Sequence, residues 1–431
     1  MKLSVNNKLI VYYLINVSSL SNKSMLRIFG GGILGTLFTI KLSQKFVVEL
    51  YEQSSNLIPS FNSIKINDYY LNPGHHALEM PRGKDTFEIL NLASKYIKLK
   101  KKDHLRFICI SGEVASFTDT INKLPKILKL DIKSLLNNNP RLINNDQEFR
   151  NILMSKDSIY GSSYVACMKR FSDNPKDTWT LFYPWMFPAE FAFKGNDEGD
   201  IFRRKVRSLN LNPFIIIPEN ELFENVANQF SQFLKSKNIN LNLNFNSSIN
   251  LLTSNKNSEN KNIWCGPAMA LTKEFGKIDG LIKCKRHFYI LLFEIIEFKN
   301  FLKKYNRFEI LFMEPKFYYL NKVSRAYSSS RNLLTAEILL DHKIDNNEML
   351  NMGQNLKIYF ENLFKDNLKF IGGKFLRDTY TLDPIRVNEE AEILRRNSIK
   401  HNFIIPQISW GPQNLSKAGI ITNIYAKEYL S

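Results

Sequence analysis

Residues 25–53 read MLRIFGGGILGTLFTIKLSQKFVVELYEQ, and this stretch decides the fold. An apolar segment at 26–29 is followed by glycines, by a helix-forming segment at about 33–43 and by a second apolar segment at 46–51 that ends in an acid. We therefore predict a strand, a glycine turn, an amphipathic helix and a second strand, which together form the first half of a dinucleotide-binding βαβ unit.

Gly30, Gly32 and Gly35 fit the pattern G-x-G-x-x-G. In this pattern the first glycine permits a tight turn, the second lets a pyrophosphate approach the backbone, and the third lets helix and strand pack closely. The phosphates would lie on the N-terminus of the helix, where N–H groups and the helix dipole favour anions. Glu52, about twenty residues further on, is placed to accept hydrogen bonds from ribose hydroxyls. The alternative is a structural glycine turn in an ordinary α/β unit, but the order of strand, glycines, helix, strand and acid favours dinucleotide binding.

The composition sets limits on size and partners. A chain of 431 residues is long enough for two or three domains with sizeable cores. The net charge of +18 is compatible with nucleic acid or an anionic membrane as a partner, but the lysines are spread along the chain. The dense basic run at 98–102 is typical of a solvated face. We therefore expect no nucleic-acid partner, and a small-molecule substrate that could carry a phosphate or a nucleotide.

The cysteines and the N-terminus bear on the compartment. Four widely spaced cysteines form no C-x-x-C pair, so neither a zinc site nor a disulfide framework is expected. Residues 1–24 contain a short apolar run without a small-residue cleavage site, and Met25 directly precedes the first strand. We interpret residues 1–24 as an extension before the native start, and we expect a cytoplasmic protein without a transmembrane segment.

A turn with two histidines follows the next pair of strands. Residues 64–71 alternate as in a β-hairpin and lead into the turn Asn72-Pro73-Gly74-His75-His76. Adjacent histidines could indicate a metal site, but the other four histidines are scattered and no acid cluster accompanies them. We expect no metal there, and instead a polar turn that packs on a planar group.

The rest of the chain predicts a second domain. Periodicity predicts helices at 84–99, about 221–236 and up to 430, and strands at 105–111, 213–218, 239–245, 287–293, 308–313, 333–340 and 403–408. A strand from 262 ends in Gly-Pro, which suits the edge of a nucleotide-binding sheet. The runs between 285 and 340 indicate a mixed or antiparallel sheet. An aromatic segment at 179–191 could wall a ligand cavity or belong to a core.

These segments together resemble the flavoprotein superfamily of amine oxidases, protoporphyrinogen oxidase and UDP-galactopyranose mutase. The glycine loop with Glu52 is similar to its N-terminal FAD fingerprint, and YLNPGHH at 70–76 is similar to its turn against the flavin. Similar blocks are found at 214–272, at LNKVSR (320–325) and at 403–430, the last resembling the C-terminal FAD motif. The chain departs from the family at Ile58-Pro59, which replaces a Gly-Gly pair, at Lys322, where relatives often carry arginine, and at Gly411, which lacks a neighbouring aspartate or arginine.

The resemblance implies an α/β fold, with a Rossmann-like FAD-binding domain of the glutathione-reductase type and an inserted mixed α+β substrate domain. The FAD domain would combine residues 25–90, 213–275 and 375–431, and the substrate domain residues 91–212 and 276–374. The implied FAD contacts are Gly30, Gly31, Gly32, Leu34, Gly35, Glu52, Gln53, Pro73, Gly74, His75, Gly411, Asn414 and Leu415. The implied catalytic candidates are His75 and His76. Apart from the resemblance, the basic residues Lys322, Arg325 and Arg377 are candidate substrate contacts that would suit a diphosphate.

Three functions stay open on this basis. The first is an FAD-dependent oxidoreductase that takes a hydride from an unidentified organic substrate. The second is a redox-neutral sugar-nucleotide mutase, in which arginines would bind a diphosphate. The third is a non-catalytic flavin-binding protein, motivated by the missing Gly-Gly pair and by Lys322. The substrate, the electron acceptor and the oligomeric state are not defined by the sequence.

Overall fold

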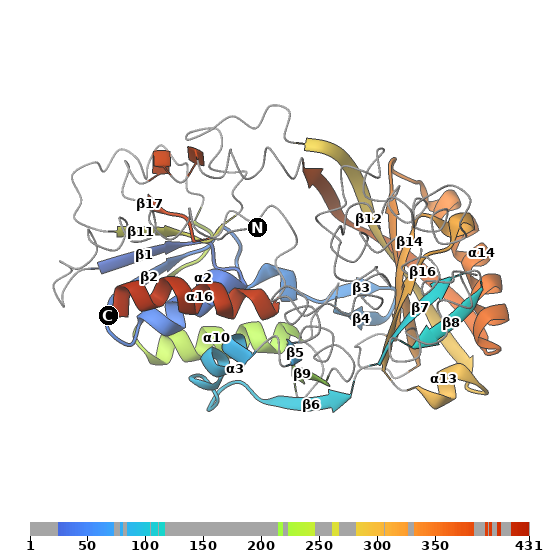
Figure 1. Ribbon diagram of the computed structural model, residues 1–431, viewed down its shortest axis with the longest axis horizontal. Coiled ribbons are helices and arrows are strands. Elements are labelled where there is room, and N and C mark those ends of the chain that lie inside the picture. Colours follow the sequence, from blue (N-terminus) through green and yellow to red (C-terminus); the bar gives the residue numbers. More distant parts are fainter. Residues whose placement is uncertain are drawn as a thin grey trace, which may run out of the picture.

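The computed structural model describes residues 25–72, 78–80, 84–103, 105–110, 112–116, 214–218, 223–245, 261–266, 282–305, 307–325, 332–382, 393–394, 396–398, 403–406 and 415–430. Figure 1 shows two lobes, one built on a small sheet with helices packed against it and the other on a large sheet with one long helix on its outer side.

The first lobe contains a five-stranded parallel sheet with the order β10-β2-β1-β11-β17. Its strands are β1 (Met25–Phe29), β2 (Val47–Tyr51), β10 (Asn240–Asn242), β11 (Lys261–Trp264) and β17 (Phe403–Ile404). In chain order this is 3-2-1-4-5, the arrangement of a dinucleotide-binding sheet, whose topological switch point lies between β1 and β11. The predicted α/β class with a parallel sheet is confirmed.

The helix after the glycines, α2 (Ile33–Leu42), differs from the amphipathic helix that we predicted. Eight of its ten residues are buried. The reason is that α16 (Leu415–Leu430) and α3 (Lys84–Asn91) pack against α2 in addition to the sheet (Figure 1). By contrast, α10 (Phe223–Ser236) is amphipathic, and its buried residues recur at the 3.6-residue period.

The predicted helix at 84–99 is wrong in its second half. The helix ends at Asn91, turns follow, and β6 (Leu99–Asp103) begins a three-stranded sheet with β9 (Phe214–Pro218) and β5 (Leu78–Met80). Ile89, Ala93 and Ile97 are all buried, so the apolar spacing continues through the turns and imitates a longer helix.

The second lobe contains a seven-stranded sheet with the order β16-β12-β15-β14-β13-β7-β8. The strands are β7 (Leu105–Ile110), β8 (Glu113–Ser116), β12 (Ile282–Glu297), β13 (Phe308–Phe312), β14 (Leu320–Arg325), β15 (Leu333–Leu340) and β16 (Asn367–Leu382). β13 and β7 run parallel and the other pairs are antiparallel, so the predicted mixed sheet is confirmed. The predicted domain boundary at 374/375 falls inside β16.

One face of this sheet carries the core of the second lobe. α14 (Asn346–Phe364), which the sequence reading did not predict, buries Leu356, Phe360 and Phe364 against it. The helix begins with a capping box in which Asp345 and Glu348 each accept a hydrogen bond from the other's backbone N–H.

The opposite face, here called the inner face, receives the predicted hairpin. Its strands, β3 (Ile64–Ile66) and β4 (Tyr69–Leu71), pack Ile66 and Leu71 against apolar side chains of β12 and β15. The Tyr69 hydroxyl also donates to Glu294 Oε1 at 3.2 Å, and Asn67 Nδ2 donates to the carbonyl of Ile371 at 2.8 Å. The hairpin therefore connects the two lobes (Figure 1).

Candidate cofactor-binding site

The glycine loop lies at the switch point of the parallel sheet. Gly30 has φ +100°, a conformation that L side chains rarely adopt, and its N–H donates to the carbonyl of Tyr51 at 2.8 Å. A Cβ on Gly30 would lie 2.5 Å from the nitrogen of Gly266, just after β11. Glycine is therefore required at position 30 both by the turn and by the close approach of the end of β11.

Gly35 and Gly32 differ in what surrounds them. A Cβ on Gly35 would lie 1.9 Å from the carbonyl oxygen of Gly30, so this glycine lets the helix pack on the loop. A Cβ on Gly32 would meet no described atom within 4 Å, and Gly32 has an ordinary φ of −63°. Neither backbone nor packing demands glycine at position 32. The open space before the N-terminus of α2 is what an approaching pyrophosphate requires, so the loop fits a dinucleotide.

Glu52 holds this loop in place. Its Oε2 accepts the N–H of Gly31 at 2.6 Å, and its Oε1 accepts the N–H of Ser54 at 2.7 Å. The carbonyl of Gly31 in turn accepts from the N–H of Ile58 at 2.8 Å and from Thr36 Oγ1 at 3.2 Å. A carboxylate has about four lone-pair sites, so the buried Glu52 keeps acceptor capacity for a ribose.

Ile58, one of the two residues at which the sequence departs from the resembled pattern, has a strained backbone conformation. It has φ +47° and ψ +63°, and its side chain is fully buried. A β-branched residue in the left-handed region is an outlier, because its Cβ crowds the following carbonyl. A left-handed position is therefore occupied here by a residue that this conformation strains.

The sequence reading did not identify Cys265 and Gly266 as part of the loop. The N–H of Cys265 donates to the carbonyl of Phe29 at 2.7 Å, which draws the end of β11 against the end of β1. Burial raises the pKa of the Cys265 thiol, so the side chain stays neutral. The signal in the sequence was the Gly-Pro at the end of the strand, but its contact with Gly30 depends on the strand order.

Several predicted site residues lie outside the described residues. These are Pro73, Gly74, His75, His76, Gly411 and Asn414. Leu34 is buried in α2, Gln53 is exposed beyond β2, and Leu415 begins α16. Asn72, the last described residue before the histidine turn, is buried, and its Oδ1 accepts the N–H of Phe223 at 3.1 Å. The turn therefore starts at the N-terminus of α10.

Lys322 lies on the inner face of the large sheet. Its Nζ is 2.9 Å from Glu337 Oε1 and 3.7 Å from Glu309 Oε1, and all three side chains are buried. The three charged groups come from the adjacent strands β13, β14 and β15. Because Glu337 pairs with Ile290, which contacts the hairpin, the ion cluster lies next to the place where the hairpin docks.

The other two predicted substrate residues are placed elsewhere. Arg325 lies on the face of the large sheet that α14 covers. Its Nη1 donates to the carbonyls of Leu302 and Tyr305 at 3.2 and 2.9 Å. Arg377 is exposed, with its guanidinium 5.8 Å from the centre of the Phe288 ring. The structure does not bring Lys322, Arg325 and Arg377 together.

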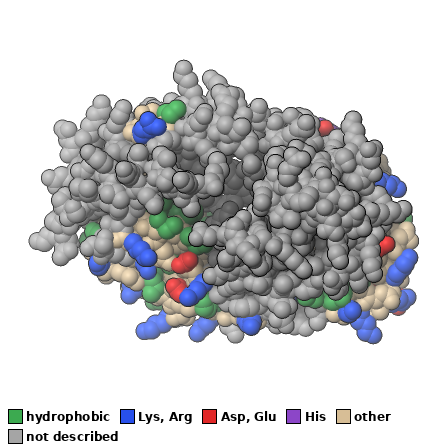
Figure 2. Space-filling model, viewed as in Figure 1, with side chains coloured by type: hydrophobic (Ala, Val, Ile, Leu, Met, Phe, Trp, Pro, Cys, Tyr) green, Lys and Arg blue, Asp and Glu red, His purple; other side chains and the backbone are tan. Residues whose placement is uncertain are grey.

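Two further features of the described residues bear on the predictions. They contain no group of three His, Cys, Asp or Glu side chains that could hold a metal ion. No described helix is both long and apolar enough to cross a membrane. On the face shown in Figure 2, the Lys and Arg side chains of the described residues lie apart from one another along the lower rim.

Neither protein-family models nor curated proteins match the sequence. Solved structures do. An oxidoreductase from Methanosarcina mazei is 10% identical with a TM-score of 0.55, covering 94% of this chain and all of its own. A protein from Exiguobacterium sp. 255-15 assigned as a protoporphyrinogen oxidase is 12% identical with a TM-score of 0.56, covering 96% of this chain and all of its own. A reduced UDP-galactopyranose mutase is 13% identical with a TM-score of 0.56, covering 94% of this chain and 96% of its own.

The chain shares its overall fold with these three solved structures. Two of these three structures carry names that the sequence resemblance gave, and each alignment covers both lobes. The likeness therefore extends well beyond the glycine loop.

Proposed function

We propose that this protein is an FAD-dependent oxidoreductase that oxidises an organic substrate. The observation that carries the proposal is the contrast within the glycine loop. Packing requires glycine at positions 30 and 35, whereas a Cβ on Gly32, at the N-terminus of α2, would meet none of the described atoms within 4 Å. A purely structural turn gives no reason for a glycine at position 32.

The adenosine and pyrophosphate end of FAD would be held by the described residues. The backbone of Gly31, Gly32 and Ile33 would face the pyrophosphate at the helix N-terminus. Glu52, already fixed by two backbone donors, would accept from the ribose hydroxyls, and the exposed Gln53 lies next to it. When bound, FAD supplies the capacity to accept a hydride, which no side chain has.

The flavin end would be held by segments that the resemblance identifies. We assign Pro73, Gly74 and His75 to this role, with Gly411, Asn414 and Leu415 from the tail. His75 or His76 would hold or move a proton, since a histidine titrates near neutral pH. In this arrangement the FAD domain is assembled from separate pieces of chain, and the seven-stranded sheet belongs to an inserted substrate domain.

The substrate would lie between the histidine turn and the inner face. The hairpin that packs Leu71 on this face leads directly into the turn, and the ion cluster of Lys322 lies on the neighbouring strands. A buried charged cluster beside a proposed cofactor site is a candidate for substrate recognition.

The test is the visible absorption spectrum of the purified full-length protein, followed by release and identification of the chromophore. The bands of an oxidised flavin, with FAD released by denaturation, are the expected result. Protein that is colourless and also fails to take up added FAD would overturn the proposal. With FAD bound, anaerobic bleaching of the flavin by members of an amine, alcohol and porphyrinogen panel would identify the reducing substrate.

A redox-neutral mutase is a second candidate, favoured by the likeness to reduced UDP-galactopyranose mutase. The three predicted basic residues give the mutase function little support, because the side chains of Lys322 and Arg325 lie on opposite faces of the sheet. A UDP-sugar should shift the spectrum of the reduced flavin if the mutase reading is right. No response at saturating ligand, together with bleaching by an organic reductant, would exclude it.

A further inference from the structure

A close contact joins α16 to the first turn of α3. The N–H of Gly419 donates to Thr86 Oγ1 at 2.9 Å, and one helical turn later Asn423 Nδ2 donates to Asp85 Oδ1 at 2.7 Å. A Cβ on Gly419 would lie 2.1 Å from the backbone nitrogen of Thr86. Because Gly419 and Thr86 are both buried, the two helices approach this closely only with glycine at position 419.

This contact lies between the two segments assigned above to the flavin end. The histidine turn, residues 73–77, is followed by β5 and then by α3, which begins at Lys84. The C-terminal segment, residues 411–414, directly precedes α16, which begins at Leu415. Since β5 and α3 both contact α16, the chain just after the histidine turn packs against the helix just after the C-terminal segment.

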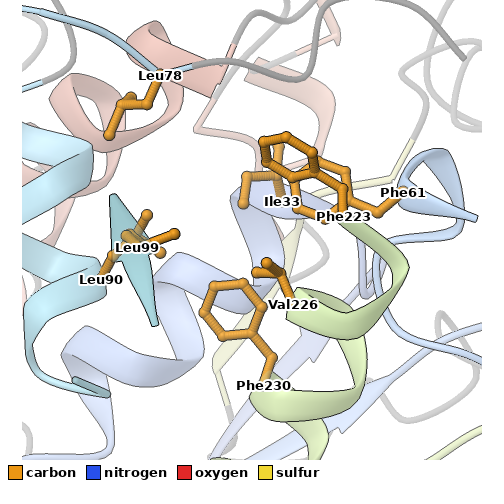
Figure 3. Close-up of a pocket in the computed structure, with 8 residues that line it drawn as sticks. All are labelled: Ile33, Phe61, Leu78, Leu90, Leu99, Phe223, Val226 and Phe230. Atoms are coloured by element: carbon orange, nitrogen blue, oxygen red, sulfur yellow. The ribbon is translucent and has the colours of Figure 1, made fainter. Parts of the chain in front are cut away.

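Both sides of the histidine turn are fixed in the core of the first lobe. Before the turn, Asn72 Oδ1 accepts the N–H of Phe223 at 3.1 Å. After the turn, Leu78 is 1% exposed, and Leu78 and Phe223 line the same small gap in the apolar core (Figure 3). β5 is therefore held in place, so a shift of α16 against α3 would move the C-terminal segment relative to the turn.

We infer that Gly419 and Thr86 are positioning residues for the flavin end of the site, because their contact sets how the C-terminal segment and the histidine turn lie relative to each other. The inference rests on the proposed function, which assigns both segments to FAD. The adenosine and pyrophosphate end does not depend on this contact. There the bonds from the N–H of Gly31 to Glu52 and from the N–H of Gly30 to the carbonyl of Tyr51 hold the glycine loop.

The test compares FAD with ADP, which lacks the flavin, by calorimetric titration of the full-length protein freed of bound nucleotide. Gly419→Ala forces α16 away from α3, so its dissociation constant for FAD should rise about tenfold or more. Its dissociation constant for ADP should stay within about twofold of wild type. The visible circular dichroism of FAD bound at saturation should also change, because this signal depends on the surroundings of the flavin ring.

Gly353→Ala is the matched control. On α14 in the second lobe, a Cβ on Gly353 would lie 2.3 Å from Cζ of Phe370, so this variant has a comparable helix-packing clash away from the segments assigned to FAD. It should lower the melting temperature and leave both dissociation constants within about twofold of wild type. The inference fails if Gly419→Ala weakens FAD and ADP equally, or if its FAD affinity and dichroism are those of wild type.

Thr86 supplies a second pair of variants in case Gly419→Ala does not fold. Thr86→Val keeps the shape of the side chain but removes the acceptor for the Gly419 N–H, and it should weaken FAD by about threefold without weakening ADP. Thr86→Ser keeps the hydroxyl and should restore FAD affinity. Equal FAD affinities in the two Thr86 variants would overturn the inference while leaving the proposed function intact. If the wild-type protein does not bind FAD at all, the proposed function fails on its own spectral test, and this inference fails with it.

Discussion

The backbone N–H of Gly31 donates to Oε2 of Glu52 at 2.6 Å, across 21 residues of sequence. The residue that we predicted to contact a ribose therefore also fixes the loop that we predicted to contact the pyrophosphate. The carboxylate connects the end of β2 to the end of β1, so the two halves of the candidate nucleotide site are positioned together before any ligand arrives.

Replacing Glu52 should lower the free energy of unfolding. Glu52→Ala removes both charge-assisted bonds to backbone N–H groups and should lower the free energy of unfolding by about 2–3 kcal/mol. Glu52→Gln keeps an acceptor of the same size and should lose about half as much. Denaturant titration measures both, with Glu88→Gln on the exposed face of α3 as the control, expected within about 0.5 kcal/mol of wild type. An unchanged Glu52→Ala would show that the Gly31 bond does not hold the loop.

The two glycines with different surroundings should respond differently to the same substitution. Gly35→Ala places a methyl group 1.9 Å from a backbone oxygen, so it should lower the melting temperature clearly. Gly32→Ala meets no described atom and should leave the melting temperature of the FAD-free protein within about 2 °C of wild type, a shift corresponding to less than about 0.5 kcal/mol. FAD content after reconstitution should nevertheless fall strongly in Gly32→Ala, because the methyl group occupies the approach of the pyrophosphate. Full FAD content in Gly32→Ala would contradict the proposed site.

Lys322 should be important for stability because of its burial. Lys322→Met leaves Glu309 and Glu337 without the ammonium between them and should cost about 3–5 kcal/mol. Lys357→Met breaks a partly exposed ion pair with Glu361 on α14 and should cost about 0.5 kcal/mol or less. Adding Glu337→Gln to Lys322→Met should recover part of the loss. If urea titrations give the same loss of unfolding free energy for Lys322→Met and Lys357→Met, the buried cluster contributes no more to stability than a surface ion pair.

The raised pKa of Tyr51 predicts that the protein loses stability in alkali. Burial, and then the hydrogen bond from its hydroxyl to Glu49 Oε2 at 2.6 Å, raises the pKa of Tyr51 to about 12. In the unfolded chain a tyrosine ionises at about 10, so the unfolded state releases the proton first. The stabilisation of the folded state that comes from this difference in pKa is fully present below about pH 10 and is lost as the pH rises toward about 12. The unfolding midpoint of Tyr51→Phe should fall less steeply over this range, whereas Tyr70→Phe, at an exposed side chain on β4, should follow the wild type.

The parts of the fold that the sequence predicted are those whose cause is local. The glycine spacing, the apolar strands around it and the alternation at 64–71 each depend on neighbouring residues, and the structure contains all of them. The length of the helix at 84–99 was wrong because buried residues in turns kept a helical spacing. α14 was missed although Asp345 and Glu348 provide a capping-box signal, since its apolar residues are diluted by asparagine.

The site was predictable only in part for the same reason. Gly32 and Glu52 are read from spacing, but the contact of Gly30 with Gly266 requires the order of strands in the sheet. The cluster of Glu309, Lys322 and Glu337 requires the register of three strands. Such non-local relationships have no signature in a single sequence.

Ile58 offers the sharpest test of the backbone at the departure from the family pattern. A glycine normally makes a folded protein less stable than an alanine at the same position, because glycine loses more conformational freedom on folding. At position 58 the order should reverse. Ile58→Ala loses a fully buried side chain and keeps the left-handed strain, so it should cost about 2–5 kcal/mol. Ile58→Gly loses the same packing but relieves about 1–2 kcal/mol of strain, and should therefore be the more stable of the two.

Ile28 on β1 supplies the matched control, because it is equally buried and lies in an ordinary strand. There glycine should be less stable than alanine by about 0.5–1 kcal/mol. Urea titration of the four variants gives the two differences directly. Opposite signs at positions 58 and 28 establish that Ile58 is held in a left-handed conformation that glycine adopts without strain. The same sign at both positions would mean that Ile58 is not held in that conformation. The N–H of Ile58 donates to the carbonyl of Gly31, so Ile58→Gly also tests whether the strain at position 58 is needed to keep the glycine loop in place. If the hydrogen bond alone suffices, the FAD affinity of Ile58→Gly should stay within about threefold of wild type, a change in binding free energy of less than about 0.7 kcal/mol.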